Sequence, residues 1–269
     1  MLSKFINKSD QKKAIFPYKA SFKRGLIMSP QPALLLLPNL LSDFRHAEVF
    51  LPISVYKAMQ TIDGLIAESE TEGRKYLKRF ETKKPAAFMP IALYNEHSPE
   101  NQLDFLLEPI EKGERWGLIS DAGLPCIADP GSHLVLRARR KGLTVQAFSG
   151  PSSILLALML SGLPSQKFFF QGYLDKEPQK RKDQIRRLLT QSQSEQATQV
   201  LIEAPYRNTH MLMALIETLP ESSWLTVAWD LTLPSQGVIT QTVAEWKKSS
   251  LPNLEKKPAI FLFCGVIPK

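Results

Sequence analysis

The sequence predicts an α/β protein with two α/β domains, in which the N-terminal sheet is mostly parallel and the C-terminal sheet is mixed. Short apolar segments alternate with segments of helical periodicity, which is typical of strands joined by crossover helices. Loops rich in Gly, Pro and Asp follow several of the apolar segments. In the second half this alternation is less regular, so we place an N-terminal domain at residues 30–150 and a C-terminal domain at 151–269.

Each expected element rests on a short segment of the chain. An apolar run that ends in Gly, Pro or Asp predicts a strand, and apolar residues three and four positions apart predict a helix. In chain order we expect a strand at 34–37, a strand at 63–67, a helix at 74–80, a helix from Ser98 that Pro109 ends or kinks, a strand before Ser120, a helix at 132–142, a strand at 143–148 and a helix at 154–161 that stops at Gly162. In the second half we expect strands from Phe168, at 200–203, at 225–229 and at 258–264, and a helix at 209–219.

The composition argues against several classes of protein. No segment approaches the ~18 consecutive apolar residues that a membrane span requires, so no membrane association is expected. The two cysteines, Cys126 and Cys264, lie far apart and outside any paired motif, which argues against a disulfide framework or a zinc site. The four histidines are isolated from one another, and no metal is expected. A cytoplasmic protein is the simplest expectation.

The positive charge is concentrated at the N-terminus. Residues 1–27 contain seven Lys or Arg and one acid, so they account for +6 of the net charge of +8. We expect residues 1–29 to be a disordered basic tail. Three interpretations stay open: an arm that contacts RNA phosphates, a solvated tail without a role, and a mis-assigned start whose true position is Met28.

The loop from Ser120 to Gly131 is the most informative motif. It follows an apolar strand and reads Ser-Asp-Ala-Gly-Leu-Pro-Cys-Ile-Ala-Asp-Pro-Gly. Its Gly and Pro residues permit a close approach of backbone to a ligand, and exposed N–H groups can hold a carboxylate or another polar group. The carboxyl ends of parallel strands are also where open α/β sheets bind ligands. A tight connection without a ligand is the alternative.

Three further segments allow both a structural and a functional interpretation. The loop at 150–153 suits hydrogen bonds to a ligand at the same sheet edge, or N-capping of the next helix. Glu203 ends a strand, where a carboxylate can orient a hydroxyl or act as a base, or can form a surface ion pair with Arg207. The six Lys or Arg at residues 176–187 suit either phosphate contacts or a solvated helix face.

Taken together, these motifs resemble the tetrapyrrole methylase superfamily of S-adenosylmethionine-dependent methyltransferases. Within it, the chain looks like the branch that includes the bacterial 16S ribosomal RNA ribose 2′-O-methyltransferases. Six matches in the same order carry the resemblance between about Ala33 and Gly265: 120–131, 150–153, Ser161-Gly-Leu-Pro164, Phe170-Gln-Gly-Tyr173, 203–207 and Leu231-Thr232. The resemblance implies two α/β domains with a cofactor cleft between them, S-adenosylmethionine as the cofactor, and a homodimer.

The resemblance also implies functional positions. The cofactor contacts carry over to Pro38, Ser120, Asp121, Ala122, Ile127, Ser152, Ser153, Ala204, Leu231 and Thr232. For a ribose acceptor, the candidates to orient or deprotonate the hydroxyl are Glu68, Asp129 and Glu203. RNA or the small ribosomal subunit is the expected partner, with Lys180, Arg181, Lys182 and Arg207 as the candidates to contact it.

Three segments depart from the family pattern. Residues 37–40 read Leu-Pro-Asn-Leu where the family has Thr-Pro-Ile-Gly-Asn, and residues 67–71 lack the Asp and the Arg of Ala-Glu-Asp-Thr-Arg. Residues 229–233 lose both basic residues of Arg-Glu-Leu-Thr-Lys. The motifs expected to bind the cofactor therefore match the family pattern better than the motifs expected to bind the substrate. Two alternatives stay open: methyl transfer to a tetrapyrrole or another small molecule, and a degenerate, non-catalytic RNA-binding member of the fold.

Overall fold

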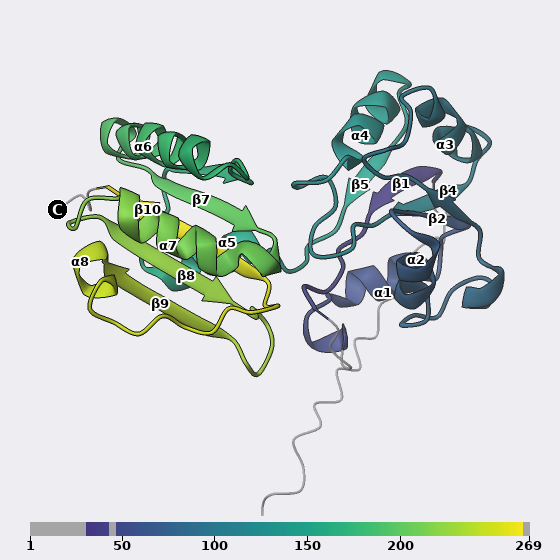
Figure 1. Ribbon diagram of the computed structural model, residues 1–269. Helices are drawn as coiled ribbons and strands as arrows, with labels where there is room; N and C mark the ends of the chain where they lie inside the picture. The colour runs from purple at the N-terminus through teal and green to yellow at the C-terminus, as the bar shows by residue number, and fades with distance from the viewer. Residues whose placement is uncertain (1–30, 43–46, 266–269) are drawn as a thin grey trace, which may run out of the picture. The chain divides into compact units, whose positions relative to one another are not determined.

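Five parallel strands form the N-terminal sheet of the computed structural model, which describes residues 31–42 and 47–265 (Figure 1). The order is β3-β2-β4-β1-β5, and every neighbouring pair is parallel. The strands are β1 (Ala33–Leu36), β2 (Gly64–Ala67), β3 (Ile91–Leu93), β4 (Arg115–Leu118) and β5 (Val145–Ala147). Because all five run in one direction, the loops that follow them emerge at one edge of the sheet. The prediction of a parallel N-terminal sheet is confirmed.

Helices cover both faces of this sheet. They are α1 (Ile53–Met59), α2 (Glu70–Leu77), α3 (Gln102–Glu111) and α4 (Gly131–Arg140), with short 3₁₀ turns η1 (Ala47–Val49) and η2 (Ala86–Phe88). Leu35 and Leu65 belong to the core that contains residues of α1 and α2, whereas Leu34 and Ile66 belong to the core that contains residues of α3 and α4. This alternation is the two-residue period of a strand. Burial on both faces explains why the strands are almost continuously apolar.

The C-terminal sheet is mixed, as predicted. Its order is β6-β7-β10-β8-β9, in which β6 and β7 are parallel and the other neighbours are antiparallel. The strands are β6 (Phe168–Gly172), β7 (Thr198–Glu203), β8 (Trp224–Trp229), β9 (Gly237–Thr242) and β10 (Ala259–Cys264). Antiparallel neighbours bring the end of one strand beside the start of the next, so residues from both kinds of strand end meet at each edge.

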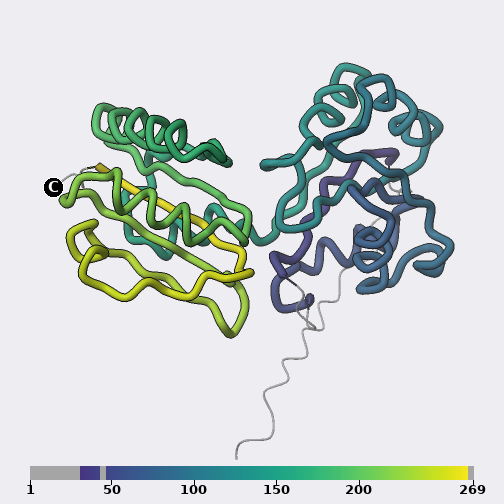
Figure 2. The backbone as a smooth tube through the Cα atoms, in the orientation of Figure 1, coloured from purple at the N-terminus to yellow at the C-terminus, as the bar shows by residue number. Residues whose placement is uncertain are grey.

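Helices cover the two faces of the C-terminal sheet unequally. They are α5 (Ser153–Ser161), α6 (Pro178–Glu195), α7 (Asn208–Thr218) and α8 (Val243–Trp246), with the 3₁₀ turn η3 (Pro205–Arg207). Phe261 and Phe263 pack in the core that contains residues of α6, α7 and α8, and Ile260 and Leu262 pack in the core that contains residues of α5. The long helix α6 lies along β7 (Figure 2).

Local side chains set several element boundaries. The Ser152 hydroxyl accepts a hydrogen bond from the Leu155 N–H at 3.4 Å, so this serine N-caps α5 as one interpretation predicted. Gly162 ends α5 in the left-handed conformation, with φ 70°. The helix predicted at 74–80 begins earlier, because Ser69 caps it by accepting from the Glu72 N–H at 3.2 Å.

Some elements differ from the prediction. Pro109 was expected to end or kink its helix; α3 continues past it to Glu111, so the first of these two alternatives is wrong. Proline removes one backbone hydrogen bond from the helix. The buried leucines of α3 pack in the core against the sheet and keep the helix in place despite this loss. Helices α1 and α8 and strands β3 and β9 were not predicted. The predicted basic tail at 1–29 lies outside the described residues. Within the part of the chain that the structure describes, no helix is both long and apolar enough to span a membrane.

Candidate functional site

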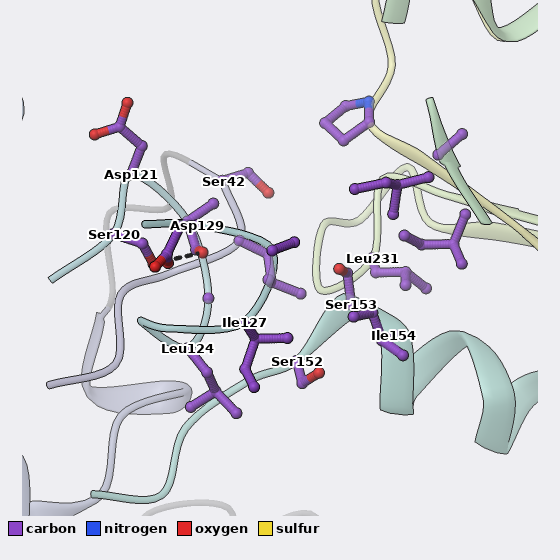
Figure 3. A pocket seen from close by; sticks show the side chains of 18 of the residues that line it. Ser42, Ser120, Asp121, Leu124, Ile127, Asp129, Ser152, Ser153, Ile154 and Leu231 are labelled. Atoms are coloured by element: carbon purple, nitrogen blue, oxygen red, sulfur yellow. Dashed lines mark hydrogen bonds between the residues drawn. The ribbon is translucent and has the colours of Figure 1, made fainter. Parts of the chain in front are cut away.

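A pocket of about 380 Å³ is lined by loops that follow β2, β4 and β5 and by strand ends of the C-terminal sheet (Figure 3). This volume is in the range of sites that hold a small molecule. The Ser120–Gly131 loop supplies much of the lining, and Ser152 and Ser153 contribute from the start of α5. Both predicted loops therefore line the same pocket.

The Asn39 side chain fastens the loop after β1 to the loop after β4. Its Nδ2 donates to the carbonyl oxygens of Ser120 and Asp121, both at 3.0 Å. Its Oδ1 accepts from the Leu40 N–H at 2.8 Å and from the Arg79 guanidinium at 2.9 Å. The residue is 3% exposed. A buried amide that is fully hydrogen-bonded in this way holds the backbone it bonds, because any change leaves several polar groups without partners.

Gly150 brings the loop after β5 against the loop after β1. A Cβ atom at this position would lie 2.1 Å from the Cβ of Pro38, far inside van der Waals contact. The Tyr76 hydroxyl donates to the Pro38 carbonyl at 3.0 Å. The loops after β1, β4 and β5 therefore form one packed unit at the carboxyl edge of the N-terminal sheet, where open α/β sheets bind ligands.

The Ser120–Gly131 loop carries a buried carboxylate and strained backbone. Asp129 Oδ1 accepts from the N–H groups of Cys126 at 2.8 Å and Gly131 at 3.0 Å, while its buried Oδ2 has no partner among the described residues. Cys126 and Ala128 have φ of 70° and 65°, a conformation that non-glycine residues seldom adopt. Such strain is concentrated at functional sites, where the surrounding structure compensates it.

The acids of the N-terminal half sit close enough to influence one another. Glu68 accepts a hydrogen bond from the Asp121 N–H at 3.2 Å. Burial is the largest cause that raises the pKa of Glu68, and the neighbouring carboxylates of Asp121 and Asp129 raise it further. Burial likewise raises the pKa of Asp121 and of Asp129, although the N–H donors of Gly131 and Cys126 lower the latter. Concentrated negative charge at this edge favours a cationic ligand.

The mixed sheet contributes acids from two strand ends. Ala259, the first residue of β10, pairs with Glu203 at the end of β7 and with Trp229 at the end of β8. This register brings Glu203 and Asp230 to one sheet edge, and both residues line the pocket. Asp230 has φ 50° and lies 3.5 Å from the Lys257 ammonium group.

Glu203 and Arg207 form a buried ion pair rather than the surface pair that sequence reasoning offered. The Glu203 side chain is 0% exposed and that of Arg207 14% exposed. Glu203 Oε1 accepts from the Arg207 guanidinium and from the Ala204 N–H. Glu203 Oε2 is buried without a partner among the described residues. One oxygen of this pocket-lining carboxylate is thus fixed, and the other has no hydrogen-bond partner among the described residues.

Most of the predicted cofactor-binding residues line the pocket. Those that do are Ser120, Asp121, Ala122, Ile127, Ser152, Ser153 and Leu231. Pro38, Ala204 and Thr232 do not line it, although each lies beside or between residues of the loops that do. All three candidate catalytic acids, Glu68, Asp129 and Glu203, also line it. Their assigned roles stay predictions.

None of the four residues predicted to contact the substrate lines this pocket. Lys180 pairs with Glu177 at 2.8 Å, and Lys182 pairs with Glu217 at 3.0 Å. Arg181 is 7% exposed and donates to a backbone carbonyl. Arg207 is engaged by Glu203, as described above. Much of the positive charge of the basic segment is therefore already paired with carboxylates of the protein.

Sequence reasoning missed two residues that shape the site. Asn39 was noted only within the segment 37–40 that departs from the family pattern, because its partners are 81 and 82 positions away along the chain. A buried amide directly after a strand that ends at a ligand-binding edge is the signal that could have identified it. Tyr173, which also lines the pocket, was noted only as part of a motif.

Comparisons with known proteins show which family this chain resembles in sequence and fold. The family model of the tetrapyrrole (corrin/porphyrin) methylases matches residues 51–247. The ribosomal RNA small subunit methyltransferase I of Thermotoga maritima is 28% identical over 207 residues, 77% of this chain and 86% of that protein. The protein of the same name from Xylella fastidiosa is 33% identical over 186 residues, 69% of this chain and 65% of that protein.

Solved structures share the fold at lower sequence identity. Diphthine synthase has a TM-score of 0.59 and 14% identity, covering 88% of this chain and 91% of that chain. The methyltransferase CobJ has a TM-score of 0.57 and 15% identity, covering 86% of this chain and 92% of that chain. At these identities the likeness shows the α/β fold alone.

Proposed function

This chain belongs to the tetrapyrrole (corrin/porphyrin) methylase family, and from that premise we propose that it methylates a ribose 2′-hydroxyl of ribosomal RNA. The methyl donor of the family, S-adenosylmethionine, carries its methyl group on a sulfonium, from which the neutral thioether is a good leaving group. The protein's task is then mainly to position the acceptor and to take up its proton. The names of the relatives from Thermotoga maritima and Xylella fastidiosa support ribosomal RNA as the acceptor.

The acidic pocket at the carboxyl edge of β4 and β5 is the observation that carries this proposal. Among the described residues that line it are five carboxylates and no Lys, Arg or His. S-adenosylmethionine has one positive charge more than its neutral thioether product, so this lining complements the donor. The backbone of residues 120–127 and the hydroxyls of Ser152 and Ser153 would hold the donor's polar groups.

Calorimetric titration tests the donor site directly. We expect S-adenosylmethionine to bind with a dissociation constant near micromolar, which corresponds to ~8 kcal/mol. Asp121→Ala should weaken this binding, because it removes one of the pocket's carboxylates. Absence of binding at millimolar ligand would favour a non-catalytic protein of the same fold.

The acceptor is tested by transfer of a tritiated methyl group to small ribosomal subunits that lack the modification. A 2′-O-methyl group blocks alkaline cleavage of the next phosphodiester bond, so label at this position is recovered in alkali-stable dinucleotides. Label in mononucleotides would place the methyl group on a base. Transfer to a porphyrinogen and not to the subunits would support the small-molecule alternative instead.

Glu203 is the residue we propose as the proton acceptor. Glu68 is hydrogen-bonded to the Asp121 N–H, and Asp129 holds two N–H groups of its own loop. Glu203 and Asp129 each keep a buried oxygen without a partner among the described residues, but Glu203 differs in that the Arg207 guanidinium compensates its charge. Glu203→Gln should lower kcat by about 10²–10⁴-fold and, because Arg207 already compensates the charge of Glu203, leave the affinity for S-adenosylmethionine within about twofold. Equal turnover by the variant would exclude this role.

The proposal includes a homodimer in the cytoplasm, built from domains at 30–150 and 151–269. The support for a dimer is the apolar surface of α5, where Leu155, Met159 and Leu160 are 48%, 76% and 46% exposed. A contiguous exposed apolar face is typical of an interaction surface. Sedimentation of the wild type should give twice the chain mass, and Met159→Glu should shift it to the monomer. A cytoplasmic location follows from a ribosomal substrate.

A further inference from the structure

A second hollow lies on the C-terminal half, beside the main pocket. It has a volume of about 390 Å³ and is lined by Gln171, Tyr173, Gln184, Arg187 and Gln191, together with two leucines. We name it the amide groove after its three glutamines. Gln184, Arg187 and Gln191 are three and seven positions apart, so they share one face of α6.

Arg187 is the available cation of this helix. Lys180, Lys182 and Arg186 each pair with a carboxylate, at distances of 2.6–3.0 Å. Arg187 is exposed and has neither an ion pair nor a hydrogen bond within the described part of the chain. An exposed guanidinium with five free N–H donors beside a polar groove is suited to a phosphate group.

The glutamines leave donors free at the same place. Gln171 Nε2 donates to Gln191 Oε1 at 3.2 Å and to Gln199 Oε1 at 2.8 Å. Gln184 Oε1 accepts from the Asp175 N–H at 2.7 Å. The amide nitrogens of Gln184 and Gln191 therefore keep their donors free, since within the described part of the chain only the oxygens of these two amides are hydrogen-bonded. Amides with fixed oxygens and free nitrogens are suited to reading the edge of a nucleobase.

Tyr173 connects the groove to the main pocket, because it lines both. Tyr173 is 59% exposed, so its ring is accessible from solvent. The pairing of β6 with β7 shifts register between Phe170 and Gly172, an irregularity that re-aims the side chains that follow. An exposed ring at this position can stack on an unpaired base.

We propose that the amide groove binds one nucleotide of single-stranded RNA next to the methyl acceptor. Arg187 holds a backbone phosphate, Tyr173 stacks on the base, and the amides of Gln184 and Gln191 contact its edge. This proposal rests on the proposed function, since it gives the RNA substrate a path to the pocket. It also moves the substrate contact from the residues predicted at 180–182 to another face of the same helix.

The test compares Arg187 with its neighbour Arg186, which has the same charge but pairs with Asp183. Full-length wild type, Arg187→Gln and Arg186→Gln are titrated with a fluorescein-labelled 12-nucleotide single-stranded RNA from 50 to 300 mM salt. We expect Arg187→Gln to bind about tenfold more weakly at low salt and to reduce the slope of log K against log salt by about 0.7. Arg186→Gln should change the affinity less than twofold.

A second pair of variants tests the stacking. Tyr173→Ala should weaken RNA binding by at least about fivefold, whereas Tyr173→Phe should retain it, because the ring and not the hydroxyl makes the contact. Equal effects at Arg186 and Arg187, or no loss in Tyr173→Ala, would overturn the groove as the RNA site.

Calorimetry with S-adenosylmethionine distinguishes a failure of the proposed function from a failure of the groove proposal alone. A wild type that binds S-adenosylmethionine but no RNA contradicts the proposed substrate, and the groove proposal with it. A wild type that binds both, with unchanged variants, contradicts the groove alone.

Discussion

The two sheets of this protein build their parts of the pocket in different ways. The parallel N-terminal sheet collects loops at one edge and joins them through close packing and through side-chain hydrogen bonds to backbone groups, with Gly150 and Asn39 at the contacts. The mixed C-terminal sheet supplies single residues at strand ends and holds them with charges, as in Glu203 with Arg207 and Asp230 with Lys257.

The difference follows from topology. Parallel strands send every following loop to the same edge, so backbone from distant parts of the chain meets there and can be joined through hydrogen bonds to the backbone. In an antiparallel arrangement only alternate strand ends reach that edge, and fewer loops are present to support one another. A carboxylate placed there depends on a cation to compensate its burial. Substitutions that remove each kind of support should therefore have different consequences.

The largest effect is expected at the charged support of the mixed sheet. Arg207→Met should lower the free energy of unfolding by about 3–5 kcal/mol, because it leaves the fully buried Glu203 carboxylate without compensation. Urea unfolding followed by circular dichroism measures this change. The double variant Glu203→Gln/Arg207→Met should recover most of the loss.

An exposed ion pair of the same half is the matched control. Lys247 lies 2.9 Å from Glu221, and both side chains are largely open to solvent. Lys247→Met should cost less than about 1 kcal/mol, since exposed pairs contribute little. A loss in Arg207→Met no larger than in this control would show that the mixed sheet does not depend on the buried pair.

The next effect is expected at the neutral support of the parallel sheet. Asn39→Ala should lower the free energy of unfolding by about 2–3 kcal/mol, because it leaves the carbonyls of Ser120 and Asp121 without their donor. The affinity for S-adenosylmethionine should fall at least about tenfold, since the pocket loop is released. Asn101→Ala, at an exposed helix start without a side-chain cap bond, should change neither quantity.

The same contrast explains how much the sequence could predict. The Ser120–Gly131 loop and its place at a sheet edge follow from a local pattern, a buried strand that ends in Gly, Pro and Asp. Strand β9 was missed because every one of its residues is only partly buried, so no clear apolar alternation marks this edge strand. Strand β3 has only three residues, also at a sheet edge.

The residues predicted to contact the substrate make contacts that the sequence does not reveal. Arg207 was a candidate for this role, and in the structure it is paired with Glu203 inside the protein. Lys180 and Lys182 were further candidates, and both are paired with carboxylates on the surface. Charge is visible in a sequence, but whether a charge is already neutralised depends on the tertiary structure. Arg187 differs from these neighbours only in that respect.

A smaller effect is expected where two loops touch. Gly150→Ala should cost about 1–3 kcal/mol, since the new methyl group overlaps Pro38 and must push the loop after β1 aside. Gly162→Ala, in open space at the end of α5 with φ 70°, should cost ~1 kcal/mol through backbone strain alone. Calorimetry with S-adenosylmethionine separates them: we expect weaker binding only in Gly150→Ala. Similar affinities in both variants would mean that the packed loops do not shape the pocket.

The smallest effect concerns pH and the acids of the two halves. The pKa of Glu68 is raised above its usual 4.5, chiefly by burial, so the folded state holds this proton more tightly than the unfolded chain. Stability from this group is present below pH 4.5 and is lost as pH rises through the raised pKa. Glu68→Gln stays neutral and can still accept from the Asp121 N–H, so its Tm should exceed that of the wild type at pH 7 and match it below pH 4.5.

Glu221 should behave in the opposite way. Its hydrogen bond with Lys247 lowers the pKa of this carboxyl, so its contribution to stability is present above pH 4.5 and is lost as pH falls through the lowered pKa. Glu221→Gln should therefore lower the Tm slightly at pH 7 and lose this effect in acid. Calorimetric scans at both pH values compare the two variants. Opposite signs would mean that the N-terminal half keeps Glu68 at a cost in stability, as expected of an acid retained for ligand binding. Equal signs would remove that distinction between the two halves.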